Sequence, residues 1–343
     1  MSIERARKAI RGEPTDRIPF FDTPLHPGFL RKLTGLDPFE HTAEAVVRAM
    51  VRLDIDMIMC GIPGPTGTRE TDPNLYNVLP LGEWRNRESG RRDIFNYDPV
   101  RERSDLPGMT EDACVVEIRR RLSTDRDLVG GTALPIGYTF QTCVHFAAED
   151  LDWETFLMAC VLEEDRVDSL LDRFQAASEK VMRAHVRTDI EVMLSHEDLA
   201  AATGLLLSPD WIRRHLIPRY RELWRPFRER GIPLLFMSDG NYLEIASDIR
   251  QAGAEGFFLD RPCMELAAMA ERCGRDAVHY TGPSPATVTT GTPADVTREV
   301  RELAEIARDL PRFFFHMPGG WVHTMPVANV QAFYDACCEY GSR

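Results

Sequence analysis

The sequence has no long apolar run, and this absence excludes a membrane-spanning helix. Such a helix needs about 18 or more consecutive apolar residues, a stretch that occurs nowhere in the chain. The first residues include Glu4, Arg5, Arg7 and Lys8, whose charges interrupt the apolar core that a secretion signal requires. We therefore expect a soluble protein of the cytoplasm.

Basic residues are in the minority, since 41 Lys and Arg stand against 54 Asp and Glu for a net charge of -13. Nucleic acids and anionic membranes attract proteins through clustered positive charge. The charge balance therefore disfavours both as partners and favours a small-molecule substrate.

Two spacing motifs are also missing. None of the eight cysteines has C-x-x-C spacing, so neither a disulfide framework nor a zinc finger is indicated. No Gly-x-Gly-x-x-Gly turn follows a predicted strand, which argues against a dinucleotide-binding fold.

Short apolar runs alternate with longer helical patterns along the whole chain. This alternation predicts an α/β protein, specifically a (β/α)8 TIM barrel, with an open doubly wound sheet as the alternative. Residues 64–105 are rich in Gly, Pro, Asn and charge, which indicates an insertion with a β-hairpin after the second strand of a single domain, 1–343. The predicted strands are 18–21, 55–60, 128–134, 190–194, 234–237, 256–259, 277–280 and 312–315.

The stretch 233–241 turns from an apolar strand into polar residues within one position. Ser238, Asp239 and Asn241 directly follow the run 234–237. Polar groups just past the carboxyl ends of parallel strands are where such folds bind ligands. The alternative is an ordinary turn, because Asp-Gly-Asn suits one in any protein. We expect the Asp239 side chain to line the C-terminal mouth of the barrel.

Other polar residues follow the remaining predicted strands, and histidine is prominent among them. A single histidine in such a place is more often structural than catalytic, but five of the nine at one rim indicate a site. These residues are Tyr138, His145, His196, Glu197, Asp198, His279, His316 and His323.

Five segments in order along the chain resemble the uroporphyrinogen decarboxylase superfamily. They are residues 12–19, 197–209, 238–241, 291–296 and 325–330. The resemblance implies a (β/α)8 barrel, a homodimer, and either methyl transfer with a corrinoid protein as partner or decarboxylation.

The chain departs from both branches of this superfamily. The methyltransferases hold zinc with a His-x-Cys pair and a later Cys, whereas this chain has Met237, Asp239 and residues 318–320 without a thiolate. Glu197, Asp239 and His316 offer a harder ligand set for a divalent metal such as zinc. The Arg-rich loop that binds a tetrapyrrole is replaced by residues 22–28, so uroporphyrinogen itself is disfavoured.

The expected activity is methyl transfer or demethylation of a small molecule, with a corrinoid protein as methyl acceptor. The alternatives are decarboxylation of a small carboxylic acid, with a proton supplied by Asp239 or a histidine, and a binding barrel that has lost catalysis. The expected catalytic residues are Asp239, His145, His316 and Glu197, and the expected substrate-binding residues are Tyr138, Ser238, Asn241, Arg261, His279 and His323.

Arg261 stands where relatives tend to have a glutamate. A guanidinium keeps its charge and forms forked hydrogen bonds with carboxylates. We expect Arg261 either to pair with Asp239 or Asp260, or to anchor an anionic group of the substrate.

Overall fold

The computed structural model describes residues 2–59, 106–140 and 142–343, so the predicted insertion at 64–105 lies outside the described residues. The chain divides into two compact units. Unit 1 holds the described residues up to 59 with Leu122–Ile136 and Phe258–Arg343, and unit 2 holds the described residues 106–121 with Gly137–Phe257.

Unit 2 alternates parallel strands with helices, and β2 pairs with β3, β3 with β6, and β6 with β7. Its strands are β2 (Leu134–Phe140), β3 (Met193–His196), β4 (Ala200–Ala201), β5 (Gly204–Leu205), β6 (Leu234–Met237) and β7 (Gly256–Phe258). Its helices are η2 (Leu106–Gly108), the start of α5 (Glu111–Val129), α6 (Cys143–Leu151), α7 (Trp153–Leu162), α8 (Glu164–Val186), α9 (Pro209–His215), α10 (Ile217–Arg230), η3 (Leu243–Ile245) and α11 (Ala246–Ala252).

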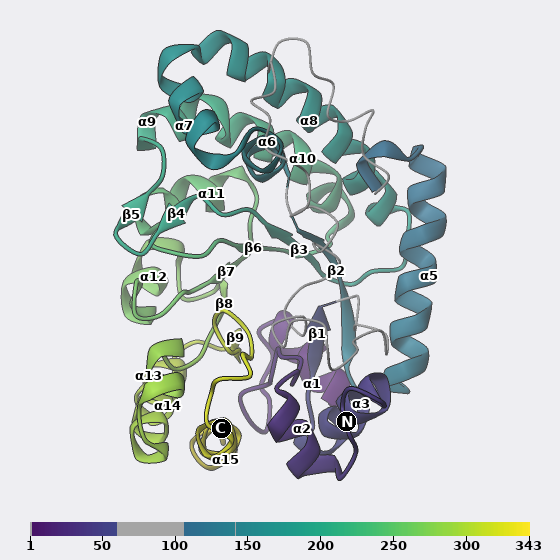
Figure 1. Cartoon of the computed structure of the whole chain (residues 1–343), viewed down its shortest axis with the longest axis vertical. Helices are drawn as coiled ribbons and strands as arrows, with labels where there is room; N and C mark the ends of the chain where they lie inside the picture. Colours follow the sequence, from purple (N-terminus) through teal and green to yellow (C-terminus); the bar gives the residue numbers. More distant parts are fainter. Residues whose placement is uncertain (1, 60–105, 141) are drawn as a thin grey trace. The chain divides into compact units, whose positions relative to one another are not determined.

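One face of helix α10 is apolar, and this face is buried in unit 2. Tyr220, Leu223, Trp224 and Phe227 recur at intervals of three and four residues, so they form one apolar face, and all four are buried. Tyr220 stacks on Trp224 with ring centroids 4.9 Å apart, and Trp224 packs on Phe236 of β6. The helix therefore packs against α8 and β6 (Figure 1).

In unit 1, β1 pairs with the first residues of β2, and β8 pairs with β9. Phe20 and Phe21 bridge to Phe315 and Met57, so the predicted first strand is reduced to two bridging residues. The other elements are α1 (Ser2–Ile10), α2 (Pro27–Thr34), α3 (Thr42–Leu53), β1 (Met57–Met59), α12 (Leu266–Cys273), β8 (Val278–Thr281), α13 (Pro285–Thr290), α14 (Pro293–Ala307), β9 (Phe313–Phe315) and α15 (Val327–Tyr340).

Within unit 2 the strand order is β2-β3-β6-β7, which follows the chain apart from the β4-β5 hairpin. The predicted α/β class with parallel strands alternating with helices is confirmed, as in a TIM-like fold. The predicted strand at 128–134 was wrong, because α5 continues to Val129 and β2 begins only at Leu134. Among the described residues, no helix combines the length and apolar character needed to cross a bilayer.

A buried carboxylate ties the N-terminal segments of unit 1 together. Asp56 has no exposed surface, and it accepts hydrogen bonds from Arg5 Nη1 at 2.5 Å and from the Phe20 amide at 2.8 Å. Arg17 Nη2 lies 3.1 Å from its second oxygen. Two segments that are separate in sequence, one with Arg5 and one with Arg17 and Phe20, thus share one acceptor.

We expect Asp56→Asn to lower the free energy of unfolding by about 3 kcal/mol, because it leaves two guanidiniums facing an amide that cannot balance their charge. Urea denaturation at pH 8 measures the change. The matched control is Asp54→Asn, since Asp54 pairs with the same arginines but its side chain is 51% exposed, and it should cost less than about 1 kcal/mol. Equal losses in the free energy of unfolding for the two variants would show that the burial of Asp56 does not make its ion pairs more important than those of Asp54.

Candidate functional site

The loops that follow β3 and β6 in unit 2 are joined by hydrogen bonds along their length. The Glu197 amide donates to the Met237 carbonyl at 2.9 Å, and the Leu199 amide donates to Ser238 Oγ at 3.0 Å. The Asn241 amide donates to the Ala201 carbonyl at 2.9 Å. Side chains at the ends of these two neighbouring strands are therefore held in a fixed arrangement.

Gly240 permits the closest approach between these loops. Its φ is +73°, and a Cβ atom there would lie 2.6 Å from the backbone of Ala200. Only glycine fits a left-handed position with so little space. The close approach brings the Asp239 amide within 2.9 Å of Asp198 Oδ1, to which it donates a hydrogen bond.

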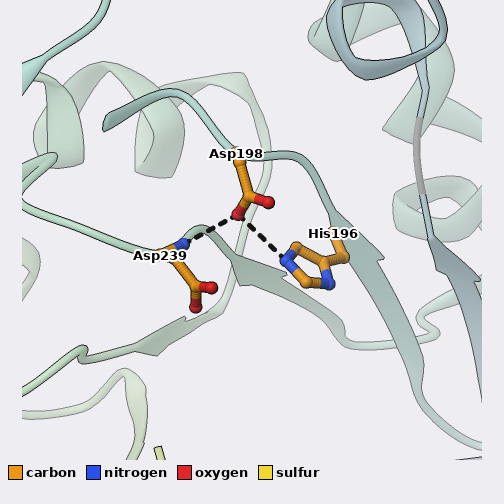
Figure 2. A group of neighbouring side chains, drawn as sticks. All are labelled: His196, Asp198 and Asp239. Atoms are coloured by element: carbon orange, nitrogen blue, oxygen red, sulfur yellow. Dashed lines mark hydrogen bonds and ion pairs between the residues drawn. The ribbon is translucent and has the colours of Figure 1, made fainter. Parts of the chain in front are cut away.

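His196, Asp198 and Asp239 form a cluster at this junction. His196 and Asp198 come from the end of β3 and its loop, and Asp239 follows β6 (Figure 2). One ligand atom from each residue lies within 4.8 Å of the others, and His196 Nε2 is 3.1 Å from Asp198 Oδ1. Burial decreases from His196, which is 8% exposed, to the exposed Asp239. One side of the cluster is thus open to a ligand.

Asp198 remains ionised in this setting. Burial alone would raise its pKa, but the hydrogen bond and charge of His196, the Asp239 amide and the charge of His145 together lower the pKa to about 2. His145 Nδ1, from α6, lies 3.8 Å from the second carboxylate oxygen. The cluster therefore carries fixed negative charge at neutral pH.

Tyr138 of β2 contacts the other nitrogen of the histidine, with its hydroxyl 3.2 Å from His196 Nδ1. Burial, together with the charges of Asp198 and Asp239, raises the Tyr138 pKa, so the phenol keeps its proton. The tautomer of His196 decides the direction of this hydrogen bond. If Nε2 binds a metal, Nδ1–H donates to the phenol oxygen; if Nε2–H donates to Asp198, the phenol donates to Nδ1.

The donor set of the cluster fits a divalent cation. One imidazole and two carboxylates are typical ligands of catalytic metal sites, in which three protein ligands leave a position for substrate. The thiolate-rich zinc site that the sequence resemblance implies for methyltransferases does not fit, because Met237 and Asp239 stand at its first two positions. Of the harder set expected from the sequence, Glu197, Asp239 and His316, only Asp239 belongs to this cluster, where His196 and Asp198 join it.

Glu197, expected as a ligand and catalytic group, has different surroundings. It has no exposed surface and accepts hydrogen bonds from the Thr142 amide and hydroxyl, from the His145 amide at 2.6 Å, and from the Tyr220 hydroxyl at 3.2 Å. Burial raises its pKa, while these hydrogen bonds oppose the rise. Its oxygens lie at the N-terminus of α6, where the helix dipole stabilises an anion.

Two other expected residues of unit 2 hold the loop that carries Asp239. Ser238 is fully buried, and its hydroxyl donates to the Asp239 carbonyl at 2.9 Å. Asn241 Oδ1 accepts from the Leu243 amide at 3.2 Å, at the start of η3. Both side chains thus bond to backbone.

The remaining expected residues belong to unit 1. His316 is buried among Phe21, Phe258 and Tyr280, its Nδ1 lies 2.6 Å from the Phe21 carbonyl, and burial lowers its pKa to about 4. His279 is fully buried, with Nε2 3.0 Å from the Gly274 carbonyl before β8, whereas His323 is exposed. Arg261 lies in the turn between β7 and α12.

With this geometry in hand, comparison with known proteins identifies the family. The family model for uroporphyrinogen decarboxylase matches residues 117–340, about two thirds of the chain. The chain belongs to the uroporphyrinogen decarboxylase family. The resemblance seen in the sequence is thereby confirmed.

Two solved structures share the fold of this chain. A methyltransferase from Methanosarcina mazei is 20% identical, with 98% of each chain covered and a TM-score of 0.68. A putative vitamin-B12 independent methionine synthase from Listeria monocytogenes is 11% identical, with 95% of this chain and 94% of the other covered and a TM-score of 0.50. At such low identity these likenesses show the fold alone. No curated protein matches the chain.

His196 and Asp198 were placed at a strand end from the sequence, but they were not among the expected catalytic, substrate-binding or metal-binding residues. Successive side chains of an extended chain point to opposite faces, so residues two apart share a face and the residue between them does not. The His-x-Asp spacing was therefore the signal that favoured these two residues over Glu197.

Glu197→Gln should lower the free energy of unfolding by about 2 kcal/mol, because it weakens charged hydrogen bonds at the N-terminus of α6, and it should leave divalent-metal binding intact. Urea denaturation and metal titration measure the two properties. Unchanged stability with loss of metal binding would instead identify Glu197 as a ligand.

The lowered pKa of Asp198 predicts a pH dependence of stability. A carboxyl group whose folded pKa lies below its unfolded value of about 3.9 stabilises the fold above that pH, by about 2 kcal/mol here, and loses the contribution as pH falls toward 2. In metal-free protein, wild type should therefore exceed Asp198→Asn in stability at pH 6, and the difference should shrink below pH 4. A difference independent of pH would refute the assignment.

Proposed function

We propose that this family member is an enzyme that transfers a methyl group from a small-molecule donor, with a divalent metal such as zinc held by His196, Asp198 and Asp239. The observation that carries the proposal is the cluster itself, with one imidazole and two carboxylates converging at the ends of β3 and β6. The family membership and the fold shared with a structure named as a methyltransferase support methyl transfer at a coarse level.

The residues around the cluster have separate roles in this proposal. The metal, when bound, acts as a Lewis acid that polarises the donor atom of the substrate. Asp198 is held as a carboxylate by His196 and the Asp239 amide, so it needs no deprotonation before it binds a cation. Tyr138 orients His196 through Nδ1, and Asp239 faces the open side where substrate enters.

The proposed acceptor of the methyl group is a corrinoid protein, as the superfamily resemblance implies. The same resemblance supports a homodimer built from one barrel domain, 1–343, that acts in the cytoplasm. His145 and His316 remain proposed catalytic residues, and Ser238, Asn241, His279 and His323 remain proposed to bind substrate, the first two by shaping the loop.

Decarboxylation of a small carboxylic acid is the second candidate, and one observation favours it. Tyr138, His196 and Asp198 form a continuous chain of hydrogen bonds at 3.2 and 3.1 Å. In that reaction carbon dioxide leaves with cleavage of its C–C bond, and the carbanion takes the phenol proton of Tyr138. A protonated His196 returns a proton to the phenolate from Nδ1–H, and solvent then reprotonates the imidazole. This candidate needs Nε2–H on His196 and no metal.

Metal analysis separates the two candidates. We expect purified protein to bind about one divalent ion per chain, with zinc, manganese and cobalt offered in turn. His196→Ala and Asp239→Asn should abolish binding, and Tyr138→Phe should weaken it about tenfold or more, because a ligand histidine loses its outer partner.

The control is Asp168→Asn, which alters another histidine and carboxylate pair of unit 2, with His215 Nδ1 2.7 Å from Asp168 Oδ1. It should bind metal as wild type does. Protein that binds no divalent ion, or that binds it equally well after Asp239→Asn, would contradict the metal-dependent proposal and leave decarboxylation as the better account.

A further inference from the structure

Arg261 lies just past the carboxyl end of β7 in unit 1, on a backbone that is tied to its neighbour. The Leu259 amide donates to the Tyr280 carbonyl at 3.1 Å, and Thr281 Oγ1 donates to the Leu259 carbonyl at 2.8 Å. The Met264 amide donates to the Asp260 carbonyl at 3.1 Å and closes the turn. The position of Arg261 is therefore set by β8 and by the turn.

The guanidinium of Arg261 has buried donors without acceptors. Its Nε and Nη1 atoms are both shielded from solvent, and within the described part of the chain neither has a hydrogen-bond partner. A buried donor without an acceptor is costly, and a guanidinium cannot escape the cost by losing its proton. Three arginines of unit 1 avoid this cost, since Arg5 and Arg17 face Asp56, and Arg343 donates to three carbonyls.

Of the two protein partners expected from the sequence, only Asp260 belongs to unit 1 with Arg261, and it does not pair with Arg261 there. No ion pair joins Arg261 to Asp260 or to another described carboxylate of that unit. Asp260 Oδ2 instead lies 3.8 Å from Cys263 Sγ. The acceptor that balances this guanidinium is therefore not supplied by its neighbour in the sequence.

We infer that Arg261 is the anchor of a binding site for the carboxylate of a small organic acid. A carboxylate is planar and accepts two parallel hydrogen bonds from a guanidinium. Its single charge balances one arginine, whereas a phosphate monoester carries close to two charges and calls for a second cation. The carboxyl end of a parallel strand is also where this class of fold binds ligands.

This site goes beyond the proposed methyl transfer and does not depend on the metal. The test uses the full chain in the presence of EDTA, which removes divalent metal. Carboxylate binding at Arg261 is then measured independently of whether the metal proposal holds. Acetate, benzoate and succinate are titrated by calorimetry, with acetamide and benzamide as neutral counterparts and inorganic phosphate as the other anion.

Wild type should bind at least one of the carboxylates with a dissociation constant below about 10 mM and should not bind the amides. Arg261→Met should abolish binding, and Arg261→Lys should weaken it about tenfold, because an ammonium lacks the fork. The control, Arg275→Gln, should bind as wild type does, since Arg275 is 70% exposed and pairs with Asp309 at the surface.

Thermal melting provides the second readout. Without ligand, Arg261→Met should melt at or above the wild-type temperature, because an unbalanced buried charge has been removed. The bound carboxylate should raise the melting temperature of wild type and not that of the variant. A variant that melts several degrees lower yet binds carboxylate normally would show that the arginine is structural. Absence of carboxylate binding by wild type, or tighter binding of phosphate, would also overturn the inference.

Discussion

The close approach of two strand-end loops is the constraint on which the candidate site depends. Gly240 leaves room for the backbone of Ala200, and this contact brings the amide of Asp239 to the carboxylate of Asp198. The amide, together with His196, outweighs the cost of burying that carboxylate and keeps it ionised. A larger residue at position 240 would therefore disturb both the position and the charge of the cluster.

The adjacent carboxylates Glu197 and Asp198 have different roles, one in stabilising the fold and one in the candidate site. Glu197 faces the interior, where the N-terminus of α6 and Tyr220 satisfy its oxygens. Asp198 faces the opposite way, beside His196 and toward the open side of the cluster. Each contributes through its surroundings, because burial and hydrogen bonds decide whether a carboxylate stabilises a helix or binds a cation.

Much of the fold could be predicted because its signals are local. The apolar run 234–237 matches β6, and Asp239 directly follows it, since a buried strand ended by Gly and polar residues has few other conformations. The predicted strand at 128–134 was wrong because Leu128 and Val129 end α5 and only Leu134 belongs to β2. Periodicity alone does not separate the end of a buried helix from a strand. The partners of Glu197 could not be read from the sequence, because Thr142 and Tyr220 lie far from it along the chain. The two Arg261 nitrogens that lack a partner among the described residues could not be foreseen either, because their surroundings depend on side-chain direction.

The central claim is that His196, Asp198 and Asp239 hold a divalent metal without a thiolate ligand. Anomalous diffraction at the zinc edge, on crystals grown with zinc, tests this directly. The account predicts one strong peak at about 2.0–2.2 Å from His196 Nε2 and from an oxygen of each carboxylate. A peak ligated by cysteine sulfur, or the absence of any peak at the cluster, would contradict it.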